Sequence, residues 1–125
     1  MNQRNVEAPA SRPREERLIV TTGKGAMVLA VSDIDWIEAA GNYARIWMGV
    51  RSYLLREPLG KLEARVRAGG FLRAHRRALV RIDSVRELRS TPDRELVAVL
   101  ATGATIPISR RRRAAFASAF RTQHH

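Results

Sequence analysis

Short apolar segments separated by turn residues recur along most of this chain, and that pattern predicts strands rather than long helices. The predicted strands cover residues 18–22, 26–31, 35–39, 43–48, 51–56, 71–74, 78–82, 85–89, 95–100 and 105–108. Glycine, asparagine, aspartate and proline gather between these segments, where turns need them. The pattern therefore indicates a mostly-β domain of about ten short strands.

One segment between the strands has helical spacing instead. Pro58 suits the first turn of a helix, because its missing N–H is not needed there. Leu59, Leu62 and Val66 then recur at i, i+3 and i+7, which places them in one stripe. Gly69-Gly70 follows and is expected to end the helix.

A second helix is predicted at the C-terminal end of the chain. Ser109 is a residue type that caps helix N-termini, and Phe116 and Phe120 lie one turn apart after it. Two short helices beside about ten strands are too little helix for an α/β fold.

Length and composition predict one folded domain with short extensions. We expect a disordered arm or linker at residues 1–17, which carry four arginines, three glutamates and few apolar side chains, a domain at 18–121, and a disordered tail at 122–125. No apolar run is longer than Ala26–Val31, which is far shorter than the roughly 20 residues of a spanning helix, and no signal-peptide pattern opens the chain. The absence of cysteine excludes disulfides and thiolate chemistry. We expect a cytoplasmic protein without a membrane segment.

The chain is strongly basic, and this narrows its partners. It has 23 basic and 12 acidic residues, a formal net charge of +11 and a pI near 11.6. All but two of the basic residues are arginine, whose planar fork can grip a phosphate or a guanine edge. Nucleic acid is the partner class that this balance favours.

The residues give little support for an enzyme activity. His75 is the only histidine before the last two positions, and no G-x-S-x-G or phosphate-binding P-loop motif occurs. Asp33 and Asp35 could pair for acid–base work, but turn carboxylates usually cap or face solvent. We expect no enzyme activity, no metal site and no cofactor.

Three basic or polar clusters are candidates for contact with a polyanion. The first is the segment Phe71–Arg81, in which Arg73, His75, Arg76 and Arg77 lie between apolar anchors. No carboxylate occurs from Gly69 to Ile82, so this predicted strand–turn–strand unit presents charge of one sign. For His75 two interpretations stay open, namely orientation of the turn by a hydrogen bond and contact with phosphate.

The second cluster is the run Arg110, Arg111, Arg112 and Arg113, directly after Ser109. Cations in the first turn of a helix oppose its dipole, which suggests that an external anion compensates them. Successive helical residues rotate by roughly 100°, so Arg110 and Arg113 share a side and the four cannot all point one way.

The third cluster is Asn42, Tyr43 and Arg45 at a predicted strand junction. Asparagine and arginine can read base edges, and tyrosine can bond phosphate, although an ordinary turn explains the same residues equally well. Within 43–48, Tyr43, Arg45 and Trp47 share one strand face. For Trp36 and Trp47 we expect packing rather than base stacking.

Four motifs in order resemble the LytTR-type DNA-binding domain, a bacterial response-regulator output family. They are Ile37-Glu38-Ala39-Ala40-Gly41-Asn42-Tyr43, then Leu54-Leu55-Arg56-Glu57-Pro58-Leu59 with Leu62-Glu63, then Phe71-Leu72-Arg73-Ala74-His75-Arg76-Arg77 through Leu79-Val80-Arg81-Ile82, and Ile106-Pro107-Ile108-Ser109-Arg110-Arg111. The resemblance covers about residues 18–120, nearly the whole predicted domain.

The resemblance implies an elongated β-sandwich of about ten strands that acts as a transcription regulator in two-component signalling. Members insert loops into successive major grooves, commonly at direct repeats. By motif, the base-contacting positions would fall at Asn42–Arg45, Arg76 and Arg110, with Arg73, Arg77, Arg111 and Arg113 mainly holding phosphates. The implied partners are double-stranded DNA, a second copy in tandem, and a separate receiver or sensor protein. Arg76-Arg77 and Arg81 depart from the residues frequent in the family, so no target sequence can be transferred.

The residues are also compatible with two other function classes. A receiver-less interaction module could regulate another transcription factor through an exposed strand edge such as Tyr43–Met48. RNA binding is the weaker option, because aromatic residues make up only 6% of the chain.

Overall fold

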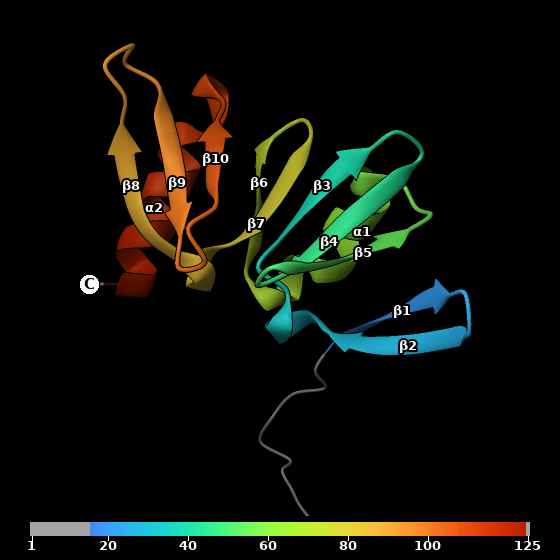
Figure 1. Ribbon diagram of the computed structural model, residues 1–125. Helices are drawn as coiled ribbons and strands as arrows, with labels where there is room; N and C mark the ends of the chain where they lie inside the picture. The colour runs from blue at the N-terminus through green and yellow to red at the C-terminus, as the bar shows by residue number, and fades with distance from the viewer. Residues whose placement is uncertain (1–15, 125) are drawn as a thin grey trace, which may run out of the picture.

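The computed structural model describes residues 16–124, and the expected arm at 1–17 therefore lies almost entirely outside the described residues. Ten strands and two α-helices form the described chain, which confirms the mostly-β prediction (Figure 1). The strands are β1 (Arg17–Thr22), β2 (Gly25–Ala30), β3 (Trp36–Ala40), β4 (Tyr43–Met48), β5 (Arg51–Leu55), β6 (Phe71–His75), β7 (Ala78–Arg81), β8 (Val85–Ser90), β9 (Leu96–Leu100) and β10 (Thr105–Ile108). The helices are α1 (Leu59–Val66) and α2 (Arg113–His124), and short 3-10 turns include η2 (Val31–Asp33), η3 (Arg67–Gly69), η4 (Ile82–Ser84) and η5 (Arg110–Arg112).

The strands form three antiparallel sheets, a β1–β2 hairpin, a five-stranded sheet and a three-stranded sheet. The five-stranded sheet has the order β5-β4-β3-β7-β6, and the three-stranded sheet has the order β10-β9-β8. The expectation that Tyr43–Met48 offers a free strand edge is wrong, because β4 pairs with β3 on one side and with β5 on the other. A sequence pattern locates a strand but not its neighbours, and pairing across β3 closes the edge.

Two apolar cores lie on opposite faces of the β6–β7 hairpin. The first core joins the five-stranded sheet to the β1–β2 hairpin and α1, and contains Ile37 and Leu79. The second joins β6 and β7 to the three-stranded sheet and α2, and contains Val80 and Phe116. Because side chains alternate along a strand, neighbouring residues of β7 enter different cores. The β6–β7 hairpin is thus covered on both faces, in the middle of the molecule (Figure 1).

Helix α1 carries the predicted stripe, and its two ends differ slightly from expectation. Leu59, Leu62 and Val66 are all buried. Pro58 was expected inside the first turn but precedes the helix with an extended backbone, as its N-cap. After η3, Gly70 has φ +85°, which disfavours any residue with a Cβ. These endings direct the chain straight into β6.

The arginine run begins in a 3-10 turn instead of an α-helix. Ser109 is the N-cap residue of η5, but its side chain makes no capping hydrogen bond. Helix α2 begins only at Arg113 and continues to His124, where we expected a disordered tail from residue 122. Phe116 is fully buried in the second core, which explains why this helix docks on the sheet.

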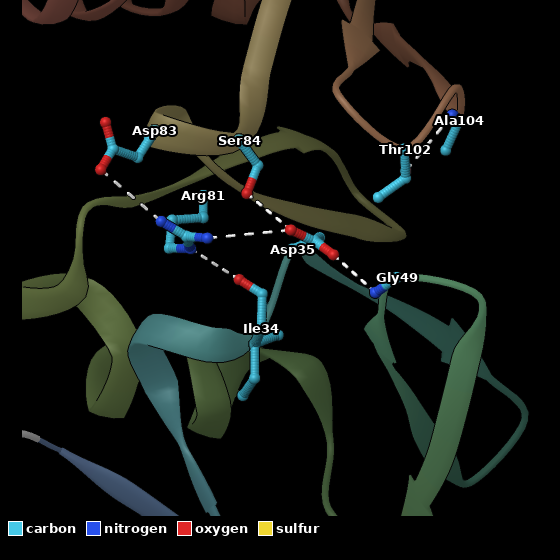
Figure 2. A network of polar contacts seen from close by, with 8 residues as sticks. All are labelled: Ile34, Asp35, Gly49, Arg81, Asp83, Ser84, Thr102 and Ala104. Atoms are coloured by element: carbon cyan, nitrogen blue, oxygen red, sulfur yellow. Dashed lines mark hydrogen bonds and ion pairs between the residues drawn. The ribbon is translucent and has the colours of Figure 1, made fainter.

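A carboxylate network fastens the start of β3 to the end of β7 (Figure 2). Asp35 Oδ2 accepts the backbone N–H of Gly49 at 2.7 Å, and Asp35 Oδ1 accepts the Ser84 hydroxyl at 2.9 Å. Arg81 lies 3.7 Å from Asp35 Oδ1, and its Nε donates to the Ile34 carbonyl at 2.7 Å. The carboxyl group of Asp35 therefore holds structural hydrogen bonds and is not free for acid–base work.

Candidate nucleic-acid interface

Two sets of backbone hydrogen bonds bring the three predicted clusters to one edge of the molecule. The Ala39 N–H donates to the Arg77 carbonyl at 2.9 Å, which joins the end of β3 to the β6–β7 turn. The Ser109 N–H donates to the Ala74 carbonyl at 2.8 Å, which joins the arginine run to the same hairpin. We call the resulting surface the three-turn edge; it comprises the β3–β4 turn (Gly41–Asn42), the β6–β7 turn (Arg76–Arg77) and Ser109–Arg113. In Figure 1 these segments lie at the top of the molecule.

His75 shapes the β6–β7 turn from within. Its Nδ1 accepts the backbone N–H of Arg77 at 3.2 Å. Burial lowers the pKa of the imidazole, and the positive charges of Arg77, Arg73 and Arg76 lower that pKa further. The ring is therefore neutral at pH 7, as an accepting Nδ1 requires. Of the two interpretations of His75, the geometry supports orientation of the turn.

Arg73, expected to hold phosphate, is occupied inside the protein. Its Nη2 lies 2.9 Å from Glu63 Oε1, and its Nη1 donates to the Arg76 carbonyl at 2.8 Å. Only 14% of the side chain is exposed. Sequence charge alone did not show that α1 supplies a carboxylate to this arginine.

The two arginines of the β6–β7 turn differ in whether their side chains already have an acceptor inside the protein. Arg77 is exposed, and its Nη2 donates to the Ala39 carbonyl at 3.2 Å, so one of its donors is already used. Within residues 16–124 the Arg76 side chain has no polar partner, and it is exposed. Arg76 is thus the guanidinium of this turn most available to an external acceptor.

The four arginines after Ser109 diverge, as the rotation argument predicts. Arg110 and Arg113 line one hollow, beside Asp93 and Glu95 of the β8–β9 loop. Arg112 lines a different hollow on the α1 side. Arg110 and Arg111 are exposed.

Arg113, a predicted phosphate contact, is directed into the protein. Its Nη2 donates to the Arg94 carbonyl at 3.1 Å, and its Nε is buried without an acceptor among the described residues. Arg94 itself has φ +65° and is exposed in the β8–β9 loop. The sequence did not identify Arg94, because a positive φ is uncommon for arginine and its residue type does not predict one.

In the third cluster the turn residues are exposed, whereas Arg45 on the sheet face has partners inside the protein. Asn42 is exposed, and Tyr43 is 42% exposed. Arg45 lies on the same face as Trp47, 3.9 Å from a Glu38 oxygen, and donates to the Ser52 hydroxyl at 3.2 Å. Asn42 and Tyr43 are therefore more available than Arg45.

Trp36 and Trp47 pack against each other, as expected. Their rings are stacked with centroids 6.0 Å apart and planes 8° apart. The Trp47 indole N–H donates to Glu38 Oε1 at 2.8 Å. Each indole thus already has an aromatic neighbour within the protein.

Neither a metal cluster nor a membrane span is found in the described part of the chain. No three histidine, cysteine, aspartate or glutamate side chains gather there in a metal-binding arrangement. Neither of the α-helices of residues 16–124 is long and apolar enough to cross a membrane.

Comparisons with known proteins agree with this geometry. The fold is similar to a solved LytTr DNA-binding domain of a methyl-accepting/DNA response regulator from Bacillus cereus, with a TM-score of 0.73 and 15% sequence identity. The match covers 84% of this chain and 96% of that chain. No curated protein matches. The family model of the LytTr DNA-binding domain matches residues 24–121. The chain therefore belongs to the LytTR family of DNA-binding domains.

Proposed function

We propose that this chain is a bacterial transcription regulator that reads double-stranded DNA by inserting the turns of the three-turn edge into successive major grooves. The observation that carries the proposal is the pair of backbone bonds, Ala39 to Arg77 and Ser109 to Ala74, which fixes three separate turns along one edge. Exposed guanidinium groups lie on two of these turns, and an exposed amide on the third. A fixed row of such groups matches the spaced acceptors of a duplex.

The available side chains divide into base readers and phosphate contacts. We assign base reading to Arg76 and Arg110, followed by Asn42, because their side chains are exposed at the tips of the edge. Tyr43, Arg77 and Arg111 are assigned to the phosphate backbone. Arg45, Arg73 and Arg113 already have acceptors inside the protein, and we assign them to fixing the surface.

The cellular setting follows from the same proposal. A second copy bound in tandem at a direct repeat would double the number of bases read and raise specificity. A separate receiver or sensor protein of a two-component pathway in the cytoplasm would supply the signal. The B. cereus protein of similar fold is described as a response regulator, which supports this setting.

The test is selection of bound sites from a random duplex pool, followed by gel shifts at two salt concentrations. Sequence-specific reading predicts one recovered motif, retained preference at the higher salt, and half-sites spaced by about one helical turn if two copies bind. Equal binding of every duplex, with affinity lost as salt rises, would contradict the proposal.

A second candidate is an interaction module that acts on another transcription factor. Ile19 and Val28 form a cross-strand pair on the outer face of the β1–β2 hairpin, and are 63% and 58% exposed. Exposed apolar pairs of this kind favour protein contact. The same gel shifts separate the two functions, because a pure interaction module binds no duplex even at low salt.

A further inference from the structure

Every nitrogen of the Arg73 guanidinium already has an acceptor inside the protein, and Glu63 supplies two of these contacts. Arg73 Nε and Nη2 donate to Glu63 Oε1 at 3.2 and 2.9 Å. The remaining nitrogen, Nη1, donates to the backbone carbonyl of Arg76 at 2.8 Å. This guanidinium therefore connects helix α1 to the tip of the β6–β7 turn.

The β6–β7 turn needs such a connection because its strand pairing is irregular. The register shifts between Arg73 and His75, so the ladder of hydrogen bonds does not run unbroken to the turn. Arg73 Nη1 spans this irregularity and fixes the carbonyl of Arg76, whose side chain is exposed and has no polar partner among residues 16–124. A turn that is already ordered loses less conformational entropy on binding than a mobile one.

We propose that Glu63 and Arg73 are positioning residues for base recognition. Glu63 orients the Arg73 guanidinium, and Arg73 holds the β6–β7 turn so that the Arg76 side chain meets DNA from one backbone conformation. This inference rests on the proposed role of Arg76 as a base reader. In this arrangement Arg73 makes no phosphate contact, although it lies in the most basic segment of the chain.

A second ion pair, between Arg65 of α1 and Glu57 just before the helix, provides a matched control. Arg65 Nη1 donates to both carboxylate oxygens of Glu57 at 3.1 Å. Glu57→Gln and Glu63→Gln each remove one negative charge and one ion pair at α1, so their general electrostatic effects on DNA binding are alike. Of the two glutamates, Glu63 is the one whose arginine partner also bonds the β6–β7 turn.

The first experiment measures the binding of each variant to two duplexes. One is the duplex that the wild-type protein selects, and the other differs from it at the base pair that Arg76 reads. Glu63→Gln should reduce the preference between these duplexes by about tenfold, with an unchanged salt slope, whereas Glu57→Gln should retain it. Arg73→Gln should behave like Glu63→Gln. Tighter binding of both duplexes by Glu63→Gln with full preference, or a fall of about one unit in the salt slope of Arg73→Gln, would overturn the proposal by showing a phosphate contact.

The second experiment needs no DNA and separates this inference from the proposed function. Hydrogen exchange of the Arg77 amide should be faster in Glu63→Gln than in Glu57→Gln, at equal global stability measured by denaturant unfolding. If wild-type protein shows no sequence preference but this difference appears, DNA reading fails and the fixing of the turn stands. Equal exchange rates in the two variants would overturn the positioning role whatever the binding data show.

Discussion

The backbone N–H of Ser109 donates to the carbonyl of Ala74 at 2.8 Å. Ala74 lies two residues before Arg76, and Ser109 lies one residue before Arg110. One hydrogen bond between main-chain atoms thus sets the distance between the two proposed base readers. Since no side chain takes part in this bond, substitutions of Arg76 or Arg110 leave the frame intact and report on recognition alone.

Replacing either proposed base reader should remove preference at one position of the DNA site. Arg76→Ala and Arg110→Ala should each lose roughly 1–3 kcal/mol of discrimination, at different base pairs, because each guanidinium would bond one base edge. Binding of single-base-pair variants of the selected duplex measures this. Arg121→Ala removes an exposed charge near the end of α2 and serves as the control. Unchanged preference in Arg110→Ala would refute its assignment.

Arg111 should behave differently from these two residues. Its side chain is exposed, and we assign it to the phosphate backbone. Arg111→Ala should weaken binding to every duplex by a similar factor and lower the salt slope by about one unit. Titrations at several salt concentrations check this, and a loss confined to one duplex would count against the assignment.

The lowered pKa of His75 makes folding stability depend on pH. The folded state holds a proton on this imidazole less readily than the unfolded chain does. The free energy of unfolding that the neutral His75 ring contributes is therefore fully present above pH 6.5. It decreases as the pH falls below that value, because the unfolded chain becomes protonated before the folded chain does. Denaturant unfolding of wild type and His75→Gln between pH 5 and pH 8 should show a smaller decrease in the variant. Parallel curves would contradict this account.

Loss of the Asp35 carboxylate should destabilise the whole domain. Asp35→Asn removes the negative charge that accepts the Gly49 N–H and that lies beside Arg81, which should cost about 2–4 kcal/mol of the free energy of unfolding. Chemical denaturation measures the change. Asp33→Asn, at an exposed position of η2, should change stability by less than about 0.5 kcal/mol. Equal effects of the two variants would show that the network does not stabilise the fold.

Short apolar segments bounded by turn residues predicted the strands, and in β1, β4 and β10 the buried side chains recur at every second residue. The burial of Leu59, Leu62 and Val66 in α1 followed from spacing in the same way. The neighbours of β4 could not be predicted, since pairing order depends on contacts between segments far apart in the chain.

The candidate site was predictable in position but not in the state of each side chain. Charge and motif order located the three segments, and the structure brings them to one edge. We expected Arg73 and Arg113 to hold phosphates, because the sequence gives the charge of a side chain and not its partners. The partners, Glu63 on α1 and the Arg94 carbonyl in the β8–β9 loop, come from elements that only the fold places beside them.

The position of the β6–β7 hairpin between the two cores has a consequence for how the domain unfolds. Leu79 belongs to one core and its neighbour Val80 to the other, so neither core can open without exposing an apolar side chain of the same strand. The two halves should therefore melt in a single cooperative transition. A duplex that engages the three-turn edge would raise the melting temperature of both halves together, which makes thermal protection a measure of binding that requires no label.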